Sequence, residues 1–394
     1  MTMSGETTFI VFEGGAPEGP VDASMRQVRA ATALDTIERL TTTFGDEISL
    51  VLVTDNPEVA AGGQALGAET LTVGPPLSSE SEGFHFGRAL TEVVNELKLD
   101  RVICFGGGSA PLYSADQWLS FIEALNRGPA VVVQNNPGSA DVFGFRPAAA
   151  INGINPPIID NFLGSLLRET GLERILPPNA AELHFDIDVP TDVQILKVVG
   201  PQLVGRRTAA LLGKGLFSGG SIPGLASSLW ERGRGGRELD LCLVGRVDVV
   251  TEQFLRANFP VRINSITEGK GLRRAVIENR PVPVITSEVV KRCGFQCLFE
   301  ILSEGVDYIV MDWRPLLAAL GEFPGAEDRF NADLLQLDHV VSPVLRDLVS
   351  ASLEAEANVI LGGHSLVSGG LWLLAKHILA QAGIAEWRPG GRPR

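Results

Sequence analysis

Two aspartates, Asp186 and Asp188, lie two positions apart in the segment HFDIDVPTDVQIL, and a proline and a third aspartate follow them. One interpretation is a helix start, in which Asp188 or Thr191 caps a helix that begins near Pro190 and Asp192 in the first turn is favoured by the helix dipole. The other interpretation is chemical: at the end of a strand, Asp186 and Asp188 could hold a divalent metal against a phosphate, because carboxylates are ligands that Mg²⁺ prefers. The segment alone leaves both interpretations open.

A glycine loop near the start of the chain is a candidate for phosphate binding. Residues 13–19, EGGAPEG, follow an apolar run, and Gly14 and Gly15 would let backbone N–H groups approach an anion closely. Arg26 and Arg29 are the first cations after this loop and could neutralise a phosphate. The loop is neither G-x-G-x-x-G nor a P-loop, so an ordinary turn between a strand and a helix is the alternative.

A second glycine loop follows a second apolar run. In FGGGSAPLYS, residues 105–114, Gly106, Gly107 and Gly108 permit close approach of a ligand and Ser109 offers a hydroxyl group. The alternative is a tight turn in which Pro111 ends the strand.

A polar segment at residues 131–147, VVVQNNPGSADVFGFRP, is the candidate for binding an acceptor. Asn135, Asn136, Ser139 and Asp141 could hydrogen-bond a polar substrate. The alternative is a strand followed by an asparagine-rich turn.

These residues must be positioned by secondary structure, and the pattern of apolar residues predicts strands that alternate with helices. Such alternation predicts an α/β fold with a mostly parallel sheet, whose ligands bind beyond the carboxyl ends of the strands. In the first half, strands are expected at 8–15, 48–55, 70–73, 101–108 and 130–136, and helices at 23–44, 86–99 and 114–126. In the second half, strands are expected at 239–246, 259–266, 282–287, 306–313 and 357–363, and helices at 249–257, 287–305 and 368–383. The predicted organisation is a first domain over 1–200, a connector over 201–238, a second α/β domain over 239–386 and a tail over 387–394.

The three motifs together resemble one family. Nucleotidyltransferases of the nucleotide-diphospho-sugar-transferase (GT-A-like) fold, in the style of the molybdenum-cofactor and phospholactate guanylyltransferases, carry similar loops in the same order. The late motif is nearly intact as DIDVPTDV at 186–193, the middle one is GGSAPL at 107–112 and the first is EGG at 13–15. The resemblance covers about residues 8–197. It implies a GT-A-like, Rossmann-like first domain that transfers a nucleotidyl group from a nucleoside triphosphate to a small phosphorylated acceptor, with Mg²⁺ held by the catalytic residues Asp186 and Asp188.

Two departures from the family pattern open an alternative function. Ser109 stands where the family has a metal-binding aspartate, and the first loop lacks the usual lysine, so Arg26 or Arg29 would have to replace it. A neutral hydroxyl holds a divalent cation less well than a carboxylate does. The alternative is therefore a catalytically degenerate nucleotide-binding or scaffold protein on the same fold. A third hypothesis is an unrelated α/β enzyme with a site around Asp312 and His364.

The composition limits the kinds of partner that the protein is expected to bind. The net charge of −14 and the pI near 4.9 make nucleic acid and anionic membranes poor partners, because an acidic surface repels phosphate backbones. Four cysteines are too few for a disulfide framework in 394 residues, which indicates a reduced, cytoplasmic protein. The expected partners are a nucleotide and a small-molecule acceptor, and the sequence is compatible with a homo-oligomer.

Overall fold

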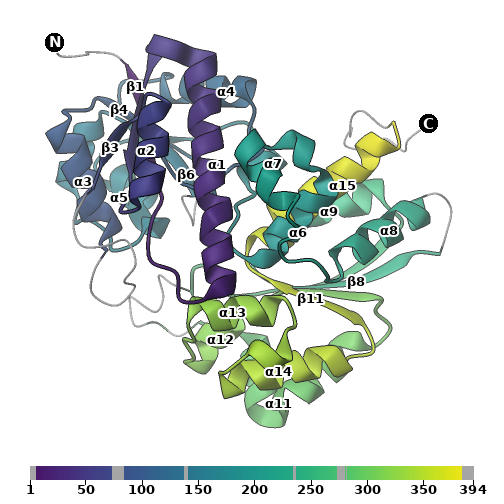
Figure 1. The fold of residues 1–394 in the computed structure, drawn as a ribbon. Coiled ribbons are helices and arrows are strands. Elements are labelled where there is room, and N and C mark those ends of the chain that lie inside the picture. Colours follow the sequence, from purple (N-terminus) through teal and green to yellow (C-terminus); the bar gives the residue numbers. More distant parts are fainter. Residues whose placement is uncertain are drawn as a thin grey trace. The chain divides into compact units, whose positions relative to one another are not determined.

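The computed structural model describes residues 6–72, 84–136, 141–233, 237–272, 280 and 282–383. Its contacts divide the chain into two compact units that interleave along the sequence. Unit 1 comprises Met1–Pro17, Arg26–Asp186 and Gln202–Leu211, and unit 2 comprises Glu18–Met25, Ile187–Pro201 and Leu212–Arg394. Both units combine helices with a sheet, so the expected α/β class is confirmed (Figure 1).

Unit 1 is built on a seven-stranded sheet. The order of the strands is β3-β2-β1-β4-β6-β5-β7, and every pairing is parallel except the two that β6 makes with β4 and β5. The first sheet is therefore mostly parallel, as expected. The strands are β1 (Thr7–Phe12), β2 (Ile48–Val53), β3 (Glu69–Leu71), β4 (Arg101–Gly106), β5 (Val131–Gln134), β6 (Val142–Arg146) and β7 (Glu173–Ile175).

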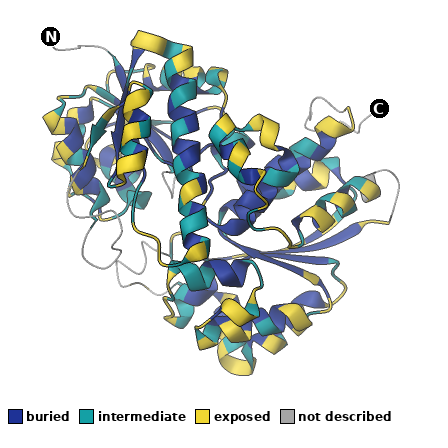
Figure 2. Ribbon diagram, viewed as in Figure 1, coloured by how far each residue is buried: buried dark blue, intermediate teal, exposed yellow. Residues whose placement is uncertain are grey.

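Helices cover both faces of this sheet because its central strands are apolar on both sides. Along β1, Phe9 and Val11 join the core under the first set of helices, and Ile10 and Phe12 join the core under the second. The first set is α1 (Pro20–Phe44), α2 (Pro57–Ala65) and α4 (Ala115–Leu125), and the second is α3 (Phe86–Glu96) and α5 (Leu163–Glu169). The central strands are buried along almost their whole length (Figure 2).

Unit 2 carries a second, four-stranded sheet, which is entirely parallel. Its order is β11-β10-β8-β9. The strands are β8 (Leu239–Gly245), β9 (Val261–Thr267), β10 (Tyr308–Asp312) and β11 (Asn358–Gly362). One face packs against α11 (Ile285–Ser303), α12 (Arg314–Leu320), α13 (Ala326–Asp333) and α14 (Pro343–Glu354). The other face lies on the side of α6 (Pro190–Val199), α8 (Ile222–Gly233), α9 (Val249–Asn258) and α15 (Gly369–Gln381) (Figure 1).

Three expectations about local structure are wrong. The strand β6 was not expected; its Gly144 allows close packing, because a Cβ there would lie 2.9 Å from the carbonyl oxygen of Val102. The strand expected at 282–287 is absent, since helix α11 begins at Ile285. Glu268 accepts hydrogen bonds from the backbone and hydroxyl of Thr286 and fixes that helix start.

The third correction concerns the segment around Asp186. It is not a strand: a single antiparallel bridge joins Asp186 to Ser109.

Among the helices of the described ranges, none is long and apolar enough to cross a membrane.

Candidate functional site

The candidate site of unit 1 lies where the direction of strand order reverses. Strands β1 and β4 are neighbours, and the chain leaves β1 towards β2 on one side before it returns to β4 on the other. In open α/β sheets such a switch point, beyond the carboxyl ends of the strands, is where ligands bind. Both glycine loops begin here, and the N–H of Gly107 donates to the carbonyl oxygen of Phe12 over 2.9 Å.

Glu13 is a buried carboxylate at the centre of this edge. It is only 3% exposed, and a Cβ at position 107 would overlap with its Oε2, so Gly107 is required for this packing. Nη2 of Arg29 lies 3.4 Å from the same oxygen. Burial raises the pKa of Glu13; Arg29 and Arg26 lower it only in part, and Asp55 raises it further. Charged groups of both signs therefore surround the first loop.

The first loop itself is fixed by polar contacts. Nη1 of Arg26 donates to the carbonyl oxygen of Gly14 over 2.9 Å. Gly15 has a left-handed φ of +101°, and its N–H donates to Oδ1 of Asp55 over 2.8 Å. An anion that approached the N–H of Gly15 would compete with the Asp55 carboxylate. Asp55 was not predicted from the sequence, although its place two positions after the apolar run 48–53 could have indicated it.

The middle and late motifs come together in the structure. Ser109 pairs with Asp186 in an antiparallel bridge, and both residues are 7% exposed. The N–H of Ala110 donates to the carbonyl oxygen of Phe185 over 3.2 Å and to Oδ1 of Asp186 over 3.3 Å. Gly108 is buried in the same turn. Ala110 adopts φ +47°, a left-handed conformation that non-glycine residues seldom take and that is found at functional sites.

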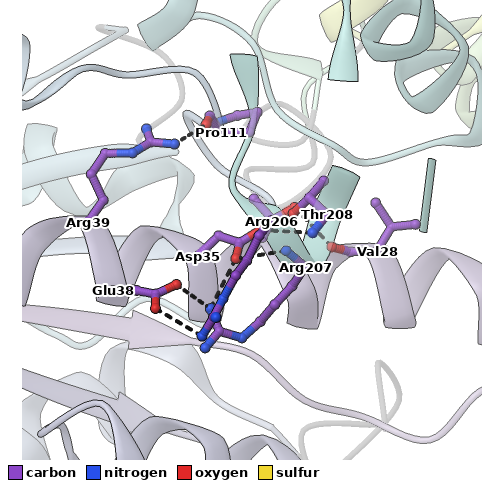
Figure 3. Close-up of polar contacts among 9 residues, drawn as sticks. Val28, Asp35, Glu38, Arg39, Pro111, Arg206, Arg207 and Thr208 are labelled. Atoms are coloured by element: carbon purple, nitrogen blue, oxygen red, sulfur yellow. Dashed lines mark hydrogen bonds and ion pairs between the residues drawn. The ribbon is translucent and has the colours of Figure 1, made fainter. Parts of the chain in front are cut away.

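Helix α1 positions the second loop and the segment 202–211. Nη1 and Nη2 of Arg39 donate to the carbonyl oxygens of Tyr113 (2.6 Å) and Pro111 (3.3 Å). Asp35 accepts the backbone N–H of Thr208 over 2.8 Å. Arg207 of α7 (Arg206–Leu212) forms ion pairs with Asp35 and Glu38 of α1, as Figure 3 shows. The helix that carries Arg26 and Arg29 is thereby held to the loop after β4.

The segment after Asp186 belongs to unit 2 and does start a helix near Pro190, as expected. The capping group is different from the one expected. Oδ2 of Asp192 accepts the backbone N–H groups of Asp188 (3.0 Å) and Val189 (2.9 Å), whereas the hydroxyl of Thr191 donates to a strand carbonyl. The Asp188 side chain is exposed.

The candidate acceptor residues lie around the turn between β5 and β6. Asn135 is 7% exposed; its Nδ2 donates to the carbonyl oxygen of Leu183 (3.1 Å) and to Asp141 (3.3 Å). The carbonyl oxygen of Asn136 accepts a hydrogen bond from Gln134. Ser139 lies outside the described residues. The polar groups of this turn thus contribute to its own structure.

A magnesium ion fits this edge only with ligands from a bound phosphate. Within the described ranges, no group of three or more histidine, cysteine, aspartate or glutamate side chains could hold a metal ion. Mg²⁺ is usually bound by one or two carboxylates together with substrate phosphates and water, and Asp186 at the bridge to Ser109 meets the requirement for a carboxylate.

Comparisons with known proteins give structural likenesses alone. No protein-family model matches the chain, and no curated protein matches it. A protein described as a nucleotide-diphospho-sugar transferase, from Desulfovibrio desulfuricans G20, is 14% identical with a TM-score of 0.37, covering 53% of this chain and 94% of its own. A cytidylyltransferase from Leptospira borgpetersenii is 10% identical with a TM-score of 0.38, again covering 53% and 94%. A CMP:2-keto-3-deoxy-manno-octonic acid synthetase complexed with CTP is 12% identical with a TM-score of 0.35, covering 54% and 100%.

Proposed function

We propose that unit 1 binds a nucleoside triphosphate at the β1–β4 switch point and transfers its nucleotidyl group to a small phosphorylated acceptor. One observation carries the proposal: three separate sequence motifs meet at one sheet edge, with Gly107 packed on Glu13 and Ser109 bridged to Asp186. A turn that served only to connect a strand to a helix would not need both contacts.

The roles of the residues follow from their positions. Gly14 and Gly15 would lie along the phosphates, and Arg26 and Arg29 would neutralise their charge. Arg29 is 34% exposed and is oriented by the buried Glu13, so it can reach a ligand with little loss of side-chain entropy. Positioning and charge neutralisation account for most of the rate in phosphoryl-group transfer.

Asp186 is the carboxylate that would hold Mg²⁺, and the sequence motif adds Asp188, two positions further along the chain. When bound, the ion would neutralise charge that develops on the phosphate oxygens. Ser109 would hydrogen-bond a phosphate or a metal-bound water. Asn135, Asn136 and Asp141 remain the proposed acceptor contacts.

A catalytically degenerate nucleotide-binding protein is the second candidate, and one observation favours it. Ser109 stands where the related motif has a carboxylate, so this edge has one ligand fewer for a divalent cation. The two candidates share nucleotide binding and differ in pyrophosphate release.

The test is a calorimetric titration of the full-length protein with each of the four common nucleoside triphosphates, with and without Mg²⁺. Arg29→Gln should weaken binding about 10-fold or more, since a charge-assisted contact to phosphate is lost. Arg127→Gln is the matched control, because Arg127 is an exposed arginine after α4, at the opposite end of the sheet. If no nucleotide binds, or if both variants bind equally, the proposal is wrong.

Catalysis is tested separately by pyrophosphate release with a panel of phosphorylated acceptors. An active transferase should lose about 10²-fold or more in turnover with Asp188→Ala, as is typical for a central electrostatic contact. Tight nucleotide binding without any release, together with tighter Mg²⁺ binding by Ser109→Asp, would support the degenerate candidate instead.

A further inference from the structure

The second sheet has a switch point of its own. Within unit 2, the order β9-β8-β10-β11 corresponds to 2-1-3-4 in chain order, and all pairings are parallel. This is a doubly wound order, and its switch point lies between the first and third strands. Here those strands are β8 and β10, so the loops that follow Gly245 and Asp312 mark the place where a ligand would bind.

An arginine and a buried aspartate meet at this point. Arg246 follows β8, and its Nε and Nη2 donate to Oδ2 (2.6 Å) and Oδ1 (3.2 Å) of Asp312, the last residue of β10. The Asp312 side chain is fully buried, whereas the Arg246 side chain is 29% exposed. Burial raises the pKa of Asp312, but Arg246, His364 and Arg314 more than offset this, and its pKa lies below the usual range.

The local backbone is shaped to hold this pair. Gly245 has a left-handed φ of +103°, and a Cβ there would overlap with the carbonyl oxygen of Asp312. A buried ion pair of this kind is a weak source of stability, because desolvation of the two charges offsets their attraction. The arrangement therefore indicates that the orientation of Arg246 matters in itself.

A second arginine at this edge follows the same pattern. Arg314 follows β10, donates to both oxygens of Asp333 and lies 3.9 Å above the ring of Trp313. Its side chain is 20% exposed, whereas that of Asp333 is fully buried. His364 comes two residues after Gly362, the partner of Asp312 on the neighbouring strand β11, and it contributes to the lowered pKa of Asp312. Two strand ends thus present arginine side chains and a third carries His364, with the two carboxylates that orient the arginines buried beneath them.

We propose that unit 2 has an oxyanion site at the β8–β10 switch point that binds the phosphate group of a small molecule. Arg246 and His364 contact the phosphate, and Asp312 is a positioning residue that acts through Arg246. Arginine suits this role because its planar, pre-oriented guanidinium matches the geometry of phosphate oxygens. Arg246, Asp312 and His364 all belong to unit 2, and neither proposal depends on the other.

Histidine NMR of the full-length protein reports on this site directly. The chain has only five histidines, so the ring signals can be assigned individually, with His364→Gln identifying the signal of His364. Inorganic phosphate is the probe, titrated at constant pH and at an ionic strength held constant with chloride. The His364 signal should shift saturably, and the other four signals should not follow it.

A matched pair of arginine variants tests the residue assignment. Arg262 also makes a bidentate pair with an aspartate of the neighbouring strand, Asp240, but near the other ends of β8 and β9. Arg246→Gln should raise the phosphate midpoint by about 10-fold or more, and Arg262→Gln should leave it unchanged. Arg246→Lys keeps the charge but loses the bidentate geometry, and it provides the same test if Arg246→Gln does not fold.

Any of four results would overturn the proposal. The first is no shift of the His364 signal in the wild-type protein. The second is a shift without saturation that the other histidine signals share. The midpoint could be equal in the Arg246 and Arg262 variants. An equal response to acetate at the same ionic strength would overturn the assignment to phosphate.

Discussion

Asp192 should make the stability of the protein depend on pH. Its side chain is fully buried, and its Oδ2 accepts two backbone N–H groups at the start of α6, while Oδ1 has no hydrogen-bond partner in the part of the chain that the structure describes. Burial, and then the charges of Asp188 and Asp333, raise its pKa well above the usual range, against the opposing effect of the two N–H donors. The folded chain therefore binds a proton at Asp192 more tightly than the unfolded chain does.

The sign of the effect follows from this difference. The stability contributed by protonated Asp192 is fully present below the pKa of the unfolded chain, about 4, and is lost as the pH rises through the pKa of the folded chain. In that range the free energy of unfolding falls by up to about 1.4 kcal/mol per pH unit for this group alone. Asp192→Asn mimics the protonated acid, so its free energy of unfolding should exceed that of the wild type by more at pH 8 than at pH 5.

A second substitution separates the capping role of Asp192 from the effect of its raised pKa. Asp192→Ala removes both hydrogen bonds to the helix start, so it should be about 2 kcal/mol less stable than Asp192→Asn, at about 1 kcal/mol for each bond. The assay is urea unfolding followed by circular dichroism at pH 5 and pH 8. Asp347→Asn, at an exposed carboxylate of α14, is the control and should change stability by less than about 0.5 kcal/mol at both pH values.

Two outcomes would refute this reasoning. A difference between Asp192→Asn and the wild type that is the same at pH 5 and pH 8 would show that the pKa of Asp192 is not raised. Equal stabilities of Asp192→Asn and Asp192→Ala would show that the side chain does not cap the helix.

Three further predictions concern single contacts. Thr191→Val should lower the free energy of unfolding by about 1 kcal/mol in urea titrations, because the hydroxyl that donates to the carbonyl oxygen of Leu361 is lost with little change in shape. Gly107→Ala should weaken binding of nucleoside triphosphates in calorimetry and lower the melting temperature, since its Cβ would overlap with the buried Glu13; unchanged binding would contradict the proposed loop geometry. Asp35→Ala should lower the free energy of unfolding by about 2 kcal/mol, measured by thermal unfolding, because two backbone N–H groups at the start of α7 lose their acceptor. Unchanged stability would show that water replaces the carboxylate.

Much of the fold could be predicted because the apolar pattern is a local property. Largely apolar runs gave β2, β5 and β8, and their burial on both faces requires helices on either side, which fixes the α/β class. The start of α6 at Pro190 was also predictable, since proline fits the first turn of a helix. The bridge between Ser109 and Asp186 joins two of the motifs that the sequence had singled out.

What the sequence by itself determined is therefore the kind and order of the elements, together with the loops at which parallel strands end. Only the tertiary structure decided which groups meet there, because those contacts join residues far apart in the chain. The start of α1 lies in unit 2 and is capped by Glu327, which accepts the backbone N–H of Asp22 across 305 positions. The partners of Asp55 and Arg246 are 40 and 66 positions away in the sequence. Hydrophobic periodicity acts over a few residues, whereas burial of a charge depends on every element packed around it, so the fold class could be predicted and the electrostatics of the sites could not.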